Sequence, residues 1–138
     1  MRPGDIYTDV MKYILAILTS LLLVQYSHAS TLAICRETAA HLSKMLPMRK
    51  DGITVIREAQ CMPSTPKNRL VYILEVNAPI ETLRQFDLRK EIKPGVLNTY
   101  CTDPEIRVTL NAFDIDHRYF TPNGTFAGSF LMRAKECR

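Results

Sequence analysis

Four cysteines constrain the fold of this chain more than any other sequence feature. They are Cys35, Cys61, Cys101 and Cys137, an even set with spacings of 26, 40 and 36 residues. In an exported chain such a set predicts two disulfides, although four cysteines allow three pairings. We prefer Cys35–Cys61, which would tie the first helix to the first strand, and Cys101–Cys137, which would fix the C-terminus to the middle of the domain. No close CxxC pair is present, so we expect neither a redox dithiol nor a thiolate zinc site. The sequence also has no glycine-rich phosphate loop, nucleophile elbow or histidine metal motif, so we expect no metal and no cofactor.

The N-terminal segment predicts export. Lys12 precedes an apolar run over residues 14–24, and small residues stand at −3 and −1 of a cut between Ala29 and Ser30. The run is shorter than the about 20 apolar residues of a membrane-spanning helix, so we favour a cleaved leader over a retained anchor. Acidic residues before Met11 are unusual in a leader and suggest that translation starts at Met11. We therefore predict a signal peptide over residues 1–29 and a periplasmic or secreted mature protein.

The mature chain, residues 30–138, is long enough for one domain with one core and too short for two ordinary domains. The whole chain carries 18 basic and 14 acidic side chains, a net charge of +4, and the signs are interspersed. A nucleic-acid binder usually shows a basic run, which is absent here, so we expect no nucleic-acid partner and a membrane contact only through the leader during export.

Hydrophobic periodicity gives the order of the elements. Apolar residues at helical spacing predict a helix that starts at Ser30 or Thr31 and ends at Pro47. Alternating patterns predict a hairpin with strands over residues 53–61 and 70–76, in which Arg57 breaks the alternation. Three helical pieces follow, near residues 79–92, 96–101 and 103–111, and we expect Lys93-Pro94-Gly95 to end the first of them.

A second hairpin surrounds Pro122-Asn123-Gly124. We expect a loop of two or four residues, which places Thr121 opposite Phe126 and Gly128 across from Tyr119. This register gathers apolar side chains on one face, and burial of one face selects register strongly. The residues of that face are Ile115, His117, Tyr119, Phe126, Phe130 and Met132.

These elements predict an α+β domain with an antiparallel sheet of about four strands and helices packed on one face. The predicted order begins with a helix and a hairpin. A helical segment with Tyr100-Cys101 and a short helix with Pro104 and Arg107 come next, and the last hairpin carries Tyr119 and Gly124 and ends at Cys137. In this order the chain resembles a loose group of small exported bacterial proteins. Many of these have no assigned activity and some belong to envelope or virulence systems, so the resemblance implies architecture more than function.

Candidate catalytic residues are few. The mature chain has only His41 and His117, which could act as base and acid of a ribonuclease-like hydrolase if both converged on one substrate. His41 lies at the border of a helix's solvent face and His117 lies mid-strand, where a hydrogen-bonded core histidine is common. In Asp114-Ile115-Asp116-His117 strand alternation separates the aspartates from the histidine, so this segment does not predict a metal site.

A basic segment around Phe86 is the candidate partner surface, although such a pattern is more often the solvated face of a helix. Its residues are Arg84, Phe86, Arg89, Lys90 and Lys93. From these observations we expect a non-enzymatic accessory or binding protein of the bacterial cell envelope, acting on a protein partner in secretion, pilus or surface-structure assembly. A secreted effector or small hydrolase using His41 and His117, and a periplasmic inhibitor or immunity protein, are the alternatives.

Overall fold

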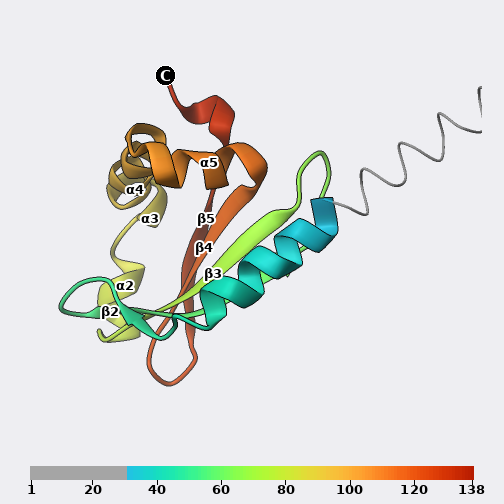
Figure 1. Cartoon of the computed structure of the whole chain (residues 1–138). Helices are drawn as coiled ribbons and strands as arrows, with labels where there is room; N and C mark the ends of the chain where they lie inside the picture. Colours follow the sequence, from blue (N-terminus) through green and yellow to red (C-terminus); the bar gives the residue numbers. More distant parts are fainter. Residues whose placement is uncertain (1–30) are drawn as a thin grey trace, which may run out of the picture. The chain divides into compact units, whose positions relative to one another are not determined.

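The computed structural model describes residues 31–138, and residues Ile34–Arg138 form one compact unit. The predicted leader, the start at Met11 and the cleavage site between Ala29 and Ser30 lie outside the described residues. A helix over residues 31–43 comes first (Figure 1). The later elements are β1 (Met48–Arg49), β2 (Thr54–Met62), β3 (Arg69–Val76), α2 (Ile80–Arg84), α3 (Leu88–Glu91), α4 (Lys93–Thr102), α5 (Pro104–Ala112), β4 (Asp114–Phe120), β5 (Phe126–Met132) and a 3-10 turn η1 (Ala134–Glu136).

The strands form one sheet in the order β1-β2-β3-β4-β5. The α+β class and both hairpins are confirmed, and the sheet has one strand more than we expected, the two-residue β1. One pair also differs from an antiparallel sheet, because β3 and β4 run parallel. Residues 77–113, which include α2 to α5, join these two strands, and a connection of this length and helical content is typical of a parallel crossover.

The core lies on one face of the sheet. Parallel register places Leu70 beside Ile115, Tyr72 beside His117 and Leu74 beside Tyr119. Alternate residues of neighbouring strands share a face, and the helices bury their own apolar residues against this one. The helices therefore pack on one face, as the periodicity predicted. The buried cluster consists of Cys35, Ala39, Leu70, Leu74, Val76, Leu83, Leu110, Phe113, Ile115, Tyr119, Phe130 and Met132.

Arg57 breaks the alternation of β2 because the strand is irregular there. The register between β2 and β3 shifts between Ile56 and Glu58, which is the signature of a β-bulge. Arg57 points to solvent, and its Nε donates to Oε2 of Glu75 on β3 at 2.9 Å. The bulge lets the strand keep apolar residues on the core face on both sides of an exposed arginine.

The tip of the second hairpin differs from the expected loop. Thr121 N–H donates to the Thr125 carbonyl at 2.9 Å, so three residues form the loop, and Gly124 adopts a φ of 85°. Phe126 consequently pairs with Phe120, is 53% exposed and does not join the core face. A register shift next to Phe120 then restores the expected pairing of Tyr119 with Gly128. Our register was right for the body of the hairpin and wrong at its tip.

The helical layer is divided differently from our expectation. Lys93-Pro94-Gly95 begins α4 instead of ending a helix, since proline is well tolerated in a first turn whose N–H groups have no helical partner. The chain breaks earlier, at Asp87, whose carboxylate accepts from the N–H groups of Arg89 and Lys90 and caps α3. Asp103 caps α5 in the same way, as predicted from the sequence.

Both preferred disulfides are confirmed. Cys35 of the N-terminal helix joins Cys61 of β2, and Cys101 of α4 joins Cys137 after β5. Their Cα–Cα distances are 5.6 and 5.5 Å, which is usual for disulfides. Each bridge therefore ties one helix of the covering layer to the sheet or to the segment that leaves it.

We expect removal of either disulfide to destabilise the domain. Replacement of Cys35 and Cys61, or of Cys101 and Cys137, by alanine should lower the free energy of unfolding by about 3 to 4 kcal/mol, because each bridge closes a loop of intermediate length in the unfolded chain. Urea unfolding of the oxidised wild type and of each double variant measures the loss. A loss below about 1 kcal/mol would contradict the chain-entropy argument.

Gly128 provides a second test of the packing. Its φ is 152°, and a Cβ added there would lie 2.7 Å from Cδ1 of Leu88. Gly128→Ala should cost about 1 to 3 kcal/mol of unfolding free energy through backbone strain and overpacking. In a Leu88→Ala background the same substitution should cost less, because the overpacking is relieved. Gly124→Ala, where φ is 85° and an added Cβ meets nothing within 4 Å, reports the cost of a positive φ at that turn without overpacking.

Candidate functional site

A groove of about 510 Å³ with a mainly apolar lining lies on the helix-covered face of the sheet. One wall comes from the end of the N-terminal helix, the following turn and β1, and the other wall comes from α4 and α5. The sheet forms the floor. The lining residues are Leu42, Met45, Leu46, Met48, Lys50, Ile56, Tyr72, Gly95, Val96, Thr99, Tyr100, Glu105, Ile106, Thr109 and His117. In Figure 1 the N-terminal helix and the α4–α5 pair stand at opposite margins of the sheet.

The first wall is apolar and partly open to solvent. Leu42 lies two helical turns after Cys35, so the residue that forms the disulfide and the residue that lines the groove share one face of the helix. Beyond the helix, Met45 and Met48 are 50% and 47% exposed. Methionine side chains are flexible and polarizable, which suits them to an adaptable binding surface.

The second wall consists of α4 and α5. Val96, Thr99 and Tyr100 recur at three- and four-residue spacing on α4, and Ile106 and Thr109 do so on α5. Asp103 lies between the two helices, where the chain changes direction. Its carboxylate accepts hydrogen bonds from the N–H groups of Glu105 and Ile106 and so caps α5. This wall is held in place at Cys101, the residue after Tyr100, by the disulfide to Cys137.

Three rings meet at the floor of the groove. The His117 ring lies 5.4 Å from the Tyr72 ring and 5.9 Å from the Tyr100 ring, both close to edge-on. The Tyr100 hydroxyl is 3.3 Å from Nε2 of His117, within hydrogen-bonding distance. Nδ1 of His117 is buried and has no hydrogen-bond partner among the residues that the structure describes. We call Tyr72, Tyr100 and His117 the floor cluster.

Burial keeps the floor cluster uncharged. Desolvation lowers the pKa of His117 to about 3, with a smaller contribution from the positive charge of Lys50. Desolvation also raises the pKa values of Tyr72 and Tyr100. An imidazole of this kind is neutral at physiological pH and is poorly matched to general acid–base work near pH 7, which needs a pKa close to the working pH.

The structure does not bring His41 and His117 together at one hollow. His117 is buried beneath the groove, whereas His41 is exposed on the outer surface of the N-terminal helix, in a hollow shared with Glu37 and Lys44. Asp114 and Asp116 point away from the groove and pair with Arg133 and Arg118. Within residues 31–138 no group of three or more histidine, cysteine, aspartate or glutamate side chains is placed to hold a metal ion.

The predicted partner surface lies apart from the groove. Arg84, Phe86 and Arg89 line a different hollow beside β5, and none of the residues predicted for this surface lines the groove. Phe86 is 48% exposed, as a contact residue would be. Its role stays a prediction.

Sequence reasoning missed the groove, although part of its signal was visible. We assigned Met45, Leu46, Val96 and Tyr100 to helical faces that would pack on the sheet. The structure leaves a gap between those faces, because the N-terminal helix and the α4–α5 pair cover different parts of the sheet. The N-terminal helix ends at residue 43, before the Pro47 at which we expected it to end, so Met45 and Leu46 lie beyond it and line the groove. Met48, an apolar residue past the predicted helix end, was the available indication.

Comparison with solved structures reveals the same fold in three proteins. A protein from Pseudomonas aeruginosa described as secreted has 14% sequence identity and a TM-score of 0.63 over 79% of this chain and 94% of its own. The type II secretion system pilotin AspS from Vibrio cholerae has 15% identity and a TM-score of 0.58 over 83% and 98%. The pilotin EpsS from Vibrio vulnificus has 15% identity and a TM-score of 0.59 over 83% and 97%.

This chain is similar in fold to two type II secretion pilotins. At these identities the likeness concerns the fold alone. No family model matches the chain, and no curated protein matches it. Two disulfides are typical of proteins in oxidising compartments outside the cytoplasm. Among the described residues, no helix is long and apolar enough to cross a membrane.

The buried imidazole makes the stability of the domain depend on pH. His117 stays neutral in the folded chain down to a pKa of about 3, whereas in the unfolded chain it takes up a proton below about pH 6.5. The neutral imidazole therefore makes its full contribution to the free energy of unfolding above pH 6.5. That contribution is lost as the pH falls, by about 2 kcal/mol between pH 8 and pH 5. Urea unfolding across this range measures the slope.

Two histidine variants separate this effect from other titrations. His117→Gln should lose most of the slope between pH 6.5 and 5, whatever its stability at pH 8. His41→Gln changes an exposed histidine and should keep the slope. An unchanged slope in His117→Gln would show that the imidazole is not held neutral by burial.

Proposed function

We propose that this chain is an exported, non-enzymatic accessory protein of the bacterial cell envelope. Its groove binds an apolar segment of a protein partner in secretion, pilus or surface-structure assembly. The observation that carries this function is the groove, whose walls are apolar side chains and whose floor is neutral. The likeness in fold to two type II secretion pilotins and to a secreted protein supports the assignment to envelope assembly.

The size and lining of the groove fit a docking site. A volume of about 510 Å³ lies in the range of ligand pockets, which are mostly apolar with a few polar groups. Two half-exposed methionines stand at its rim, next to the apolar lining, and contiguous exposed apolar patches commonly mark interaction sites. The occupant is an apolar segment because Lys50 and Glu105, the two charged lining residues, have opposite signs and favour neither charge.

The hydrolase alternative finds less support in the geometry. Acid–base catalysis by two histidines requires both rings at one substrate, whereas His41 and His117 belong to different hollows. The buried His117 is also neutral at physiological pH. The floor cluster is therefore better suited to shaping a binding surface than to proton transfer.

Site-specific photo-crosslinking tests the proposed function in the protein's own envelope. A photoreactive phenylalanine placed at Met48 or Thr99, one on each wall, should crosslink to the same envelope protein. The same group at Gln60, which is exposed on the opposite face of the sheet, should not. Met45→Asp should reduce the crosslinked product at Thr99 at least about tenfold, because a charge at the apolar rim must be desolvated when the partner docks.

The control variant is Lys44→Asp, which adds the same carboxylate one residue earlier, outside the groove. It should leave the crosslinked product unchanged. Equal products from Gln60 and from both walls, or no specific product from either wall, would contradict a partner-binding groove. Circular dichroism melts of every variant confirm that the domain remains folded.

A further inference from the structure

The free edge of β5 is a second exposed feature of the fold. β5 is the last strand of the sheet, so only one of its edges has a neighbouring strand, β4. Among the described residues, no hydrogen bond joins the backbone of β5 to a residue outside the β4–β5 ladder. A row of N–H and C=O groups on the outer edge is therefore available to another chain.

Two hollows lie beside this strand. The larger, of about 630 Å³, lies between β5 and the segment around α2 and α3, and the smaller, of about 300 Å³, lies nearer the end of β5. Neither shares a lining residue with the groove. Phe86 and Phe126 border the larger hollow and are 48% and 53% exposed. A second chain that approached the edge of β5 would therefore find room in these hollows and apolar contacts with two phenylalanine rings.

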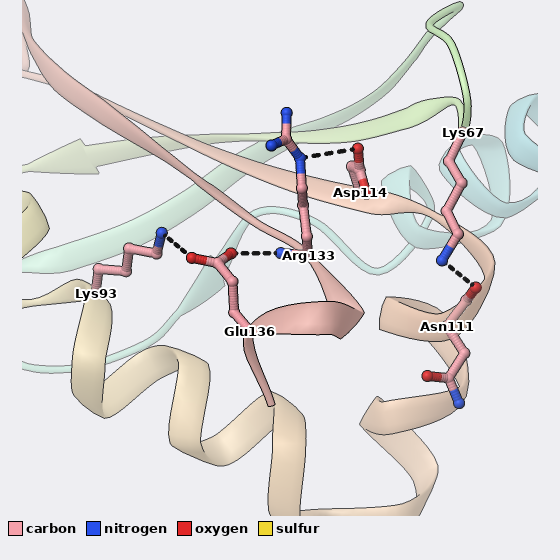
Figure 2. A network of polar contacts seen from close by, with 6 residues as sticks. All are labelled: Lys67, Lys93, Asn111, Asp114, Arg133 and Glu136. Carbon is pink, nitrogen blue, oxygen red and sulfur yellow. Dashed lines mark hydrogen bonds and ion pairs between the residues drawn. The ribbon is translucent and has the colours of Figure 1, made fainter. Parts of the chain in front are cut away.

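The charge around these hollows is strongly positive. Five cationic side chains line them, and we call these the basic margin: Arg84, Arg89, Lys93, Arg133 and Lys135. The hollows contain two carboxylates, and both are already engaged. Asp87 caps α3 and lies 3.8 Å from Lys90, and Glu136 accepts from Lys93 at 2.6 Å (Figure 2).

Part of the basic margin has no counter-charge. Arg133 lies 3.5 Å from the Asp114 carboxylate and Lys93 is paired with Glu136, so these two cations are partly neutralised (Figure 2). Within residues 31–138, Arg84, Arg89 and Lys135 take part in no ion pair. Their charges are therefore available to a negatively charged partner.

We propose that the outer edge of β5 binds an extended acidic segment of a protein partner, which adds a strand to the sheet. Main-chain hydrogen bonds to β5 supply affinity, and the basic margin selects carboxylate side chains. A second copy of this chain would bring two positive margins together, so charge disfavours pairing of β5 with itself. This site is separate from the groove, and its failure would leave the proposed function untouched.

A blocked peptide in which glutamate and valine alternate is the probe. It should bind the folded mature chain, weaken as salt is raised, and slow hydrogen exchange of the β5 amides that point away from β4 by at least about tenfold, as measured by NMR. The double variant R84E/R89E should bind it at least about tenfold more weakly. K44E/R49E carries the same change of charge near the other edge of the sheet and should bind as the wild type does.

Two control peptides separate strand addition from simple charge attraction. A peptide of equal charge with a central proline cannot complete the ladder and should bind much more weakly, and a peptide with lysine in place of glutamate should not bind. Equal binding of the proline peptide, binding of the lysine peptide or an unaffected R84E/R89E variant would overturn the proposal. Binding of phosphatidylglycerol vesicles without binding of the acidic peptide would assign the surface to lipid and also overturn it. Met45→Asp, in the groove wall, should leave peptide binding unchanged.

Discussion

The groove depends on two covalent ties, one for each of its walls. Cys35–Cys61 fixes the N-terminal helix to β2, and Cys101–Cys137 fixes α4 to the segment that follows β5. Neither wall is fully buried, and Met45 and Met48 remain half exposed. In a domain of this size packing alone gives a small margin of stability, so the bridges contribute a large share of what fixes each wall in place.

The floor cluster gives the groove its chemical character. Burial keeps the imidazole of His117 neutral, and the pKa values of Tyr72 and Tyr100, raised further by burial, leave their hydroxyls protonated. The floor therefore offers hydrogen-bonding dipoles and ring faces without charge. A charged group brought to the floor would lose its hydration, and the three rings themselves supply no counter-charge, so the floor favours uncharged side chains.

Much of the fold was predictable because the alternation within each strand agrees with the way the strands pair in the sheet. Alternation located β2 to β5, and the requirement for one buried face gave the correct pairing of Tyr119 with Gly128. The three-residue loop was mispredicted because a register shift beside Phe120 compensates for it, and such a shift has no sequence signal as strong as alternation. The parallel pairing of β3 with β4 was within reach, since a helical connection between two hairpins favours a crossover.

The candidate sites were less predictable because they are arrangements between elements. The groove is a gap between the N-terminal helix and the α4–α5 pair, and no periodicity within either helix specifies the distance between them. The position of β5 at the end of the sheet follows from topology and is equally invisible in the strand itself. The basic segment was visible, but its proximity to an open strand edge was not.

The disulfides also determine where the groove can take its final shape. Thiols stay reduced in the cytoplasm of most cells. In a reduced chain the N-terminal helix and α4 would be held to the sheet by side-chain packing alone. The loss of preorganisation in such a chain lowers its affinity for any segment that fits the oxidised groove. In the proposed function, formation of the two bridges therefore sets the moment at which the groove binds its partner tightly.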